Sequence, residues 1–313
     1  MGQLSYILKR ILQIIPVLIV VTILIFFMIR LIPGDPATVI LGDKATPDLI
    51  VEINKRLGLD KPLYVQYFLF LKALVRLDLG NSILYVVPVS QLLGKRMVVT
   101  LSLTLLSALF AVIVSFPLGY IAGFHKDKLP DQIIRTGSLV ALSMPAFWVG
   151  MLLLLGFGLK LHWFPVGGWG ETWPEHLRSL VLPAITQSLL TAALLVKNLR
   201  NNVVDVMRMD YVDFARSKGL SERTVISRHV IRNALISTVT LLAMQMAYML
   251  GGSVIIETVF ALPGVGSLMV QAIFSRDYAV VQAVVFLFAA LVLLINLLTD
   301  VSYSFLDPRV KLE

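Results

Sequence analysis

The chain has 313 residues, of which 58% are hydrophobic and only 15% are charged, and its mean hydropathy is +0.86. Soluble proteins are usually about half apolar and about a quarter charged, so this composition predicts an integral membrane protein. The absence of cysteine excludes disulfides, thiolate metal sites and cysteine nucleophiles. The net charge of +8 comes from basic residues in loops and at segment ends, where a membrane explains it without nucleic acid.

Six apolar segments predict an all-α protein with six transmembrane helices. Each segment approaches or exceeds the roughly 20 residues that a helix needs to cross the hydrocarbon layer. The fourth segment is the shortest, and we expect its helix to extend into the flanking residues. The segments cover residues 11–29, 98–122, 136–159, 180–196, 234–256 and 279–299.

The first segment follows Lys9 and Arg10, as the apolar part of a secretory signal peptide does. Its apolar run is longer than that of a typical signal peptide, and no small-residue cleavage site follows it. We therefore expect residues 1–30 to form the N-terminus and a retained first transmembrane helix.

Residues 31–97 predict a small helical segment between the first two spans. Thr46 and Pro47 are typical of a helix N-cap followed by proline in the first turn, and Gly58 is placed to end this short helix. A second amphipathic helix, rich in aromatic residues, follows it. Apolar faces of short helices usually serve packing, so we expect this segment to cover the outer ends of the spans.

The third, fourth and fifth apolar segments contain helix-bending residues and uncharged polar residues at membrane depth. Proline in the third segment is expected to interrupt its helix. The polar side chains have two explanations, which are hydrogen bonding between helices and lining of a translocation pathway. The candidate pathway residues are Met144, Pro145, Gln187, Ser188, Gln245 and Met249.

A basic loop separates the fourth and fifth segments. From Lys197 to Arg232 it contains eight Lys/Arg residues against four acidic residues. The sequence predicts two short helices joined by a sharp turn, because Gly219 suits a left-handed C-terminal cap and Ser221 suits the next N-cap. An ordinary basic loop on the cytoplasmic side is the alternative explanation of the charge.

Loop charges predict that both termini are cytoplasmic. The 123–135 loop contains three Lys/Arg residues and the 197–233 loop contains eight, whereas the 257–278 loop contains only Arg276. Basic residues are enriched in short cytoplasmic loops. The 31–97 segment also contains eight, but long translocated loops largely escape this rule.

The sequence contains no motif for catalysis, metal binding or nucleotide hydrolysis. A G-x-x-x-x-G-K-[ST] loop is absent, as are the H-E-x-x-H and G-x-S-x-G motifs. The interiors of the six segments lack Asp, Glu, Lys, Arg and His, which argues against a proton-coupled carrier. We therefore expect a chain that is not an enzyme and that binds no metal or cofactor of its own.

Four stretches resemble the permease subunits of ABC importers, and in particular the peptide/nickel branch of that family. They are the run LIPGDP with LGLDKPLYVQY, the loop ARSKGLSERTVISRHVIRNALI, the run ETVFALPGVGSLMVQAIFSRDY and the terminal LDPR. In the second stretch, Ala215 and Gly219 have the spacing of the EAA motif. Asp213 and Phe214 stand where that motif has Glu and Ala, and Arg232 stands where many members have Pro.

The resemblance implies a type I ABC-importer permease fold with a small extracytoplasmic helical segment between helices 1 and 2. It places a five-helix permease core at 98–304, a coupling loop at 203–233 and a cytoplasmic tail at 305–313. In this family the coupling loop docks into a groove on the ATP-hydrolysing subunit. The resemblance assigns docking to Tyr211, Ala215, Gly219, Leu220, Ser221, Glu222, Arg228 and Arg232.

The resemblance also implies the assembly and the function. The expected partners are a second related permease forming a heterodimer, two ABC ATPase subunits carrying ATP and magnesium, and an extracytoplasmic substrate-binding protein. This assembly would lie in the bacterial inner membrane and import di- or oligopeptides by alternating access. Nickel or a metal chelate is the alternative cargo, with glutathione or a sugar oligomer behind it. An ATP-independent carrier or channel and a membrane scaffold are the remaining alternatives.

Overall fold

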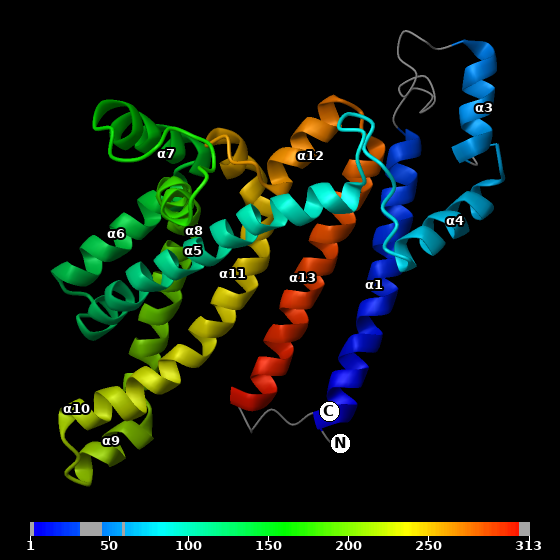
Figure 1. The fold of residues 1–313 in the computed structure, drawn as a ribbon. Coiled ribbons are helices and arrows are strands. Elements are labelled where there is room, and N and C mark those ends of the chain that lie inside the picture. Colours follow the sequence, from blue (N-terminus) through cyan, green and yellow to red (C-terminus); the bar gives the residue numbers. More distant parts are fainter. Residues whose placement is uncertain (1–2, 32–45, 58–59, 307–313) are drawn as a thin grey trace. The chain divides into compact units, whose positions relative to one another are not determined.

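The computed structural model describes residues 3–31, 46–57 and 60–306. Over these residues the chain is built from helices, and its strand-like pairing is an isolated bridge between Asn81 and Pro88. The predicted all-α class is therefore confirmed (Figure 1). The proposed end of the first short helix at Gly58, the LIPGDP run after Leu31 and the LDPR motif after Leu306 lie outside the described residues.

Four helical stretches in the described part of the chain are long and apolar enough to cross a membrane. A bent pair of helices gives a fifth span if it counts as one, and the apolar stretch Leu12–Met28 of α1 (Gln3–Leu31) is shorter. The count is thus close to the expected six without reproducing it fully. The four stretches are α5 (Val89–Phe124), α8 (Trp173–Met207), Glu222–Val259, and Tyr278–Thr299 within α13 (Tyr278–Leu306).

The chain divides into two compact units, which are described separately. The first comprises Met1–Val98 and Gly264–Leu294, and the second comprises Val99–Pro263 and Ile295–Glu313. Besides α1, the start of α5 and the first part of α13, the described residues of the first unit form three short helices. These are α3 (Pro47–Leu57), α4 (Leu63–Val75) and α12 (Val265–Phe274).

In the first unit, α4 packs on α1 through aromatic side chains. The Tyr67 ring lies edge-on to Phe26 with the centroids 5.3 Å apart, and the Tyr67 hydroxyl hydrogen-bonds the Thr22 hydroxyl over 2.9 Å. Phe26 also contacts Phe70, one turn further along α4. The aromatic face predicted for this helix therefore serves packing, although its outer positions Tyr64 and Phe68 remain exposed.

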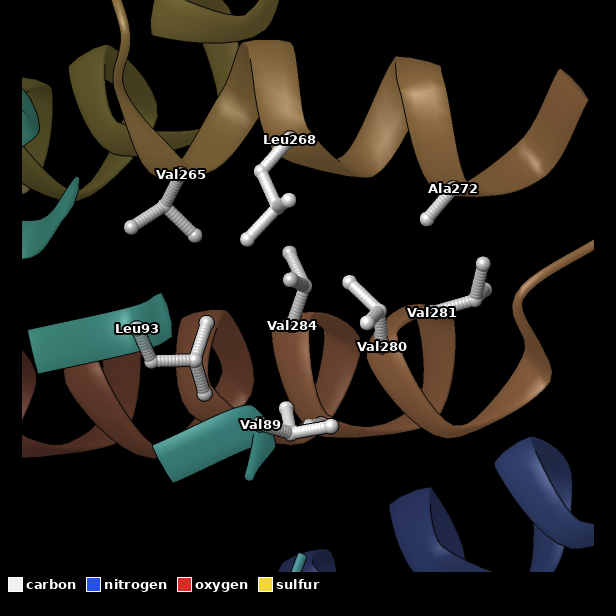
Figure 2. Close-up of a cluster of buried hydrophobic side chains, with 9 residues drawn as sticks. Val89, Leu93, Val265, Leu268, Ala272, Val280, Val281 and Val284 are labelled. Carbon is white, nitrogen blue, oxygen red and sulfur yellow. The ribbon is translucent and has the colours of Figure 1, made fainter. Parts of the chain in front are cut away.

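The core of the first unit lies between α12, α13 and the start of α5. Figure 2 shows Leu268 of α12 directed towards Val284 of α13, and Val89 and Leu93 of α5 belong to the same buried cluster. Seven of the nine buried residues of this cluster are valine or alanine, which lets the three helices approach closely. The short α12 is thereby fixed to α13 rather than left as a free loop.

Asp277 connects the loop at residues 82–84 to the start of α13. Its buried carboxylate accepts hydrogen bonds from the Ser82 hydroxyl and from the backbone N–H groups of Ile83 and Leu84. It also stands just before α13, where its other oxygen accepts from the N–H of Val280. One carboxylate therefore caps a helix and holds a loop almost 200 positions away in the sequence.

In the second unit, the expected third span is broken rather than continuous. The helix α6 (Leu129–Ser143) is bent by 100° relative to the stretch formed by α7 (Ala146–Leu153) and the π-helix η2 (Leu154–Lys160). Proline lacks an amide N–H and pushes the preceding residue out of the helical region, and Met144 has ψ 130°. The predicted interruption of the 136–159 segment at Pro145 is therefore confirmed.

Helix α8 is the centre of the second unit and packs against α6, α7 and α11 (Arg232–Val259). It begins with a capping box, in which Glu175 accepts from the backbone N–H of Thr172 over 3.2 Å. Its 35 residues extend well beyond the apolar run at 180–196, as expected for the shortest segment. It packs against α5 where α5 has two glycines, Gly119 and Gly123.

Candidate coupling loop and pathway residues

The first short helix of the predicted loop is α9 (Asp210–Ser217), and it ends as the sequence predicts. Lys218 is its C-cap and Gly219 adopts φ +80°, a conformation that costs glycine little. The N–H of Gly219 donates to the Arg216 carbonyl and the N–H of Leu220 donates to the Ala215 carbonyl. This pair of bonds is a Schellman motif, which satisfies carbonyls that the end of the helix would leave unpaired.

The second helix begins after Ser221 and continues into the membrane. It consists of α10 (Glu222–Thr224), the π-helix η3 (Val225–Ile231) and α11, with no break between them. Ser221 occupies the predicted N-cap position with extended backbone, but its hydroxyl bonds the Thr224 hydroxyl at 2.9 Å instead of a backbone N–H. The loop tip is therefore joined rigidly to the fifth membrane stretch.

An ion pair closes the turn between the two helices. Arg216 of α9 donates from Nη2 to Glu222 Oε1 at 2.8 Å and from Nε to Oε2 at 3.2 Å. It also reaches Asp213 one turn earlier at 3.3 Å. The hydrogen bond between Arg216 and Glu222 raises the pKa of Arg216 and lowers the pKa of Glu222, so the contact favours the charged form of both groups. This two-pronged geometry is specific to arginine and fixes the angle of the turn.

The inner face of the loop is part of the hydrophobic core of the second unit. Ala215 is only 5% exposed and lies with Val212, Val225 and Val230 against the end of α8, where Leu199 and Val203 are buried. Ala215 therefore has a packing role within this chain, and its side chain is not part of the free surface. The remaining members of this cluster are Ala234, Phe116, Tyr120, Phe124, Val206, Met207 and Leu235.

The outer face of the loop exposes large apolar side chains. Phe214 is 61% exposed, and Met209, Tyr211 and Leu220 are each more than 40% exposed. The Lys218 ammonium lies 4.6 Å from the centroid of the Phe214 ring. We call Met209, Tyr211, Phe214 and Leu220 the loop patch. Apolar side chains gathered at the tip of a rigid loop indicate a surface for another protein.

The other residues assigned to docking surround the loop patch. Gly219, Ser221, Glu222, Arg228 and Arg232 are exposed. The Tyr211 hydroxyl accepts a hydrogen bond from the Asn233 side chain at 3.0 Å, and Asn233 also donates to the His229 carbonyl. Tyr211 is thus held against the start of α11 while its ring remains accessible. The structure brings all eight predicted residues together within one loop, although Ala215 faces inwards.

Two glycines of α5 let the end of that helix approach α8 beside the loop. A side-chain carbon at Gly123 would lie 2.7 Å from Val203, and one at Gly119 would lie 2.9 Å from Leu199. Contacts below 3.0 Å force a shift of one of the two helices. The four-residue spacing of these glycines is a known signal for close helix packing in membranes, and the sequence prediction overlooked it.

Four of the six candidate pathway residues are buried within this chain. Gln187 of α8 donates to the carbonyl of Met249 on α11 at 2.6 Å and accepts from the Ser107 hydroxyl of α5 at 3.2 Å. Ser188 bonds the carbonyl of Ile185 in its own helix, and Gln245 is buried on α11. Hydrogen bonding between helices, one of the two explanations considered, therefore describes Gln187.

Met144 and Pro145 differ from these four because they are exposed at the bend of the third span. The neighbouring Phe147, Trp148 and Met151 on α7 are also more than 40% exposed. An apolar, exposed bend is the part of the candidate pathway set that the described chain leaves accessible.

Glu257 lies inside α11 rather than just after the fifth span, where the sequence prediction placed it. Its side chain is fully buried, and its carboxyl accepts a hydrogen bond from Thr100 of α5 at 2.7 Å. A glutamate 157 positions from its partner gives no local sequence signal, so this connection could not be predicted. Within the described residues, no group of three or more His, Asp or Glu could hold a metal ion.

The helical architecture defines a class, that of multi-span helical membrane proteins with an exposed loop between two of the spans. The family of binding-protein-dependent transport system inner membrane components matches residues 115–312, and its N-terminal counterpart matches residues 3–104. The chain belongs to this family of ABC-importer permeases, as the sequence resemblance predicted.

Relatives and solved structures agree with this family. A Brucella abortus protein named for a peptide transport system permease is 41% identical over 312 residues, covering 99% of both chains. The glutathione transport system permease protein GsiC of Salmonella choleraesuis is 38% identical over 309 residues, again covering 99% of both. The MetNI methionine ABC transporter in an inward-facing conformation matches 70% of this chain and 97% of its own with a TM-score of 0.57. At 16% identity, that structure supports the fold alone.

Proposed function

We propose that this chain is one of two permease subunits of an ATP-driven importer and forms half of a pathway for di- or oligopeptides. The observation that carries the proposal is the division of the coupling loop into two faces. Its inner face is fixed in the core of the chain, while the loop patch is exposed at its tip. Such a loop transmits force from a soluble partner to the membrane helices.

The partner is an ATPase subunit that binds ATP and magnesium, since this chain has no nucleotide-binding motif. When two ATPase subunits close on ATP, the loop patch moves with them. The Arg216–Glu222 pair and the Schellman turn keep the loop from deforming, so the movement passes into α8 and α11. Reorientation of these helices then opens the pathway alternately to the two sides of the membrane.

The proposed cargo is a short peptide. One relative is named for peptide transport and another for glutathione transport. Glutathione is itself a tripeptide, so both names indicate the same chemical class. The exposed apolar bend at Met144 and Pro145 suits varied peptides that pass without being tightly held. Selection would then rest with the extracytoplasmic binding protein.

The orientation follows from the proposed docking. The loop must face the cytoplasm, where ATP is available, and its eight Lys/Arg residues agree with the positive-inside rule. Both termini are then cytoplasmic, and the segment with α3 and α4 is extracytoplasmic. The complete assembly would contain a second related permease and lie in the bacterial inner membrane.

The docking role is tested by Phe214→Ala, with Phe274→Ala as a matched control. Both phenylalanines are exposed, at 61% and 86%, so neither change should disturb folding. Phe274 ends α12, which the proposed orientation places on the other side of the membrane. We expect Phe214→Ala to reduce co-purification of the ATPase at least fivefold at normal abundance, while the control retains it. This size corresponds to a loss of about 1 kcal/mol or more, as at a contact centre. Equal ATPase recovery with both variants would contradict the docking role.

A further inference from the structure

A pocket of about 470 Å³ lies in the second unit between the end of α5, the middle and end of α6 and the last half of α8. Its volume is within the range of roughly 300–1,000 Å³ that is typical of ligand pockets. The pocket residues on α8 come just before the coupling loop in the sequence. None of the residues that line the pocket is assigned to docking or to the pathway. Its function is therefore separate from both.

Four cationic side chains line this pocket, and two of them are already neutralised. Arg200 is 86% buried as a side chain and makes a two-pronged bond to the fully buried Asp131, with Nη2 to Oδ2 at 2.7 Å and Nε to Oδ1 at 3.1 Å. Lys126 lies 3.8 Å from the exposed carboxylate of Asp127, which is also 3.8 Å from Arg200. These ion pairs hold in place the side of the pocket that Lys126 and Arg200 line.

The other two cations, Arg135 of α6 and Lys197 of α8, are exposed. In the described part of the chain neither one forms an ion pair with a carboxylate, and Arg135 acts on the Asp131 carboxylate only at longer range, through its charge. Asp127 is the one carboxylate on the pocket wall, and it is shared by Lys126 and Arg200. The pocket thus presents net positive charge that an anion could neutralise.

Apart from Ser138 and Asn201, the remaining lining residues are apolar, and on both α6 and α8 the lining has a charged part and an apolar part. On α6 the lining passes from Arg135 to Leu139 and Leu142 as the helix enters the membrane. On α8 it passes from Val196 within the apolar segment to Lys197, near the coupling loop. The charged end therefore lies at the membrane surface and the apolar end lies in the hydrocarbon layer.

We propose that this pocket binds an anionic phospholipid, with its phosphate at Arg135 and Lys197 and an acyl chain along Leu139 and Leu142. Basic pockets between membrane helices on the cytoplasmic side recognise anionic headgroups. A soluble anion would make no use of the apolar wall, and a zwitterionic lipid would leave the positive charge uncompensated. The inference rests on the proposed orientation only for the choice of leaflet, and it does not depend on the cargo or the ATPase.

The test uses the full chain in detergent and native mass spectrometry with phosphatidylglycerol, phosphatidylcholine and inorganic phosphate as separate probes. The variant is Arg135→Gln with Lys197→Gln. The control is Lys128→Gln with Arg208→Gln, because both residues are exposed, neighbour the same region and do not line the pocket. Each double variant removes two positive charges.

The wild type and the control should retain phosphatidylglycerol in preference to phosphatidylcholine. The pocket variant should lose phosphatidylglycerol by roughly ten- to thirtyfold, as expected for two basic residues near a headgroup. Equal retention by both double variants would overturn the proposal. Displacement of the lipid by inorganic phosphate would assign the site to a soluble anion instead, and loss of binding in the assembled complex would assign it to a partner subunit. Failure here leaves the Phe214 test unaffected.

Discussion

Phe214 and Ala215 are adjacent in the sequence but face opposite ways, and the proposed coupling role of the loop rests on this division. Ala215 is buried in the core of the second unit, whereas Phe214 is exposed. The sequence comparison singled out Ala215 and treated Phe214 only as a departure from the EAA pattern. Exposure at a helix surface depends on which face the core covers, so it needed the structure.

The left-handed conformation of Gly219 leads to a prediction about the effect of a substitution at this position on coupling. Nothing lies within 4 Å of the position that a side chain would occupy, so the penalty of a substitution comes from the backbone alone. A β-branched residue at φ +80° is strained by roughly 1–3 kcal/mol. We therefore expect Gly219→Val to tilt the turn and to lower peptide-stimulated ATPase activity by fivefold or more.

The matched control for Gly219→Val is Gly251→Val, at an exposed glycine of α11 that also has open space around it. Gly251 has no positive φ, so a side chain there meets no backbone strain. Assembly and abundance should be normal in both variants, as judged by co-purification of the second permease. Full ATPase stimulation in Gly219→Val would show that the turn conformation does not matter for coupling.

At the scale of elements, the predictable features were those with local causes. The turn at Gly219, the cap position of Ser221, the helix start at Pro47 and the interruption at Pro145 follow from residues within a few positions. The 100° bend at that proline was not predicted, because the angle depends on how α6 and α7 pack on α8. The Asp131–Arg200 pair joins residues 69 positions apart, a separation that no local pattern reveals.

The close packing of α5 against α8 leads to a prediction about the stability of the protein. A side-chain carbon at Gly123 would overlap Val203, and overpacking of a close interface costs about 1–3 kcal/mol. We expect Gly123→Val to lower the thermal unfolding temperature in detergent and the abundance of the protein. Gly137→Val on α6 is the control, since no atom lies within 4 Å of its added side chain. Equal stability of the two variants would mean that α5 and α8 are not as closely packed as described.

At the scale of the whole molecule, the chain supplies membrane-spanning helices and the proposed docking loop, and its sequence contains no G-x-x-x-x-G-K-[ST] loop. The family assignment and the described helices agree on a membrane permease, and the sequence alone predicted this class from composition and four motifs. The cargo could not be derived in the same way. Its selection is expected to lie in a separate binding protein, and the pathway residues of the described chain are mostly buried in helix contacts.

The most direct test of coupling to an ATPase is co-purification of the tagged chain in mild detergent, followed by an ATPase assay with binding protein and peptide. We predict recovery of a second permease and of ATPase subunits, with hydrolysis stimulated only when peptide and binding protein are both present. Recovery of the subunits without a response to peptides would contradict the peptide cargo and direct the search to metal chelates. A chain that purifies alone and still moves solute across vesicle membranes would contradict the central claim.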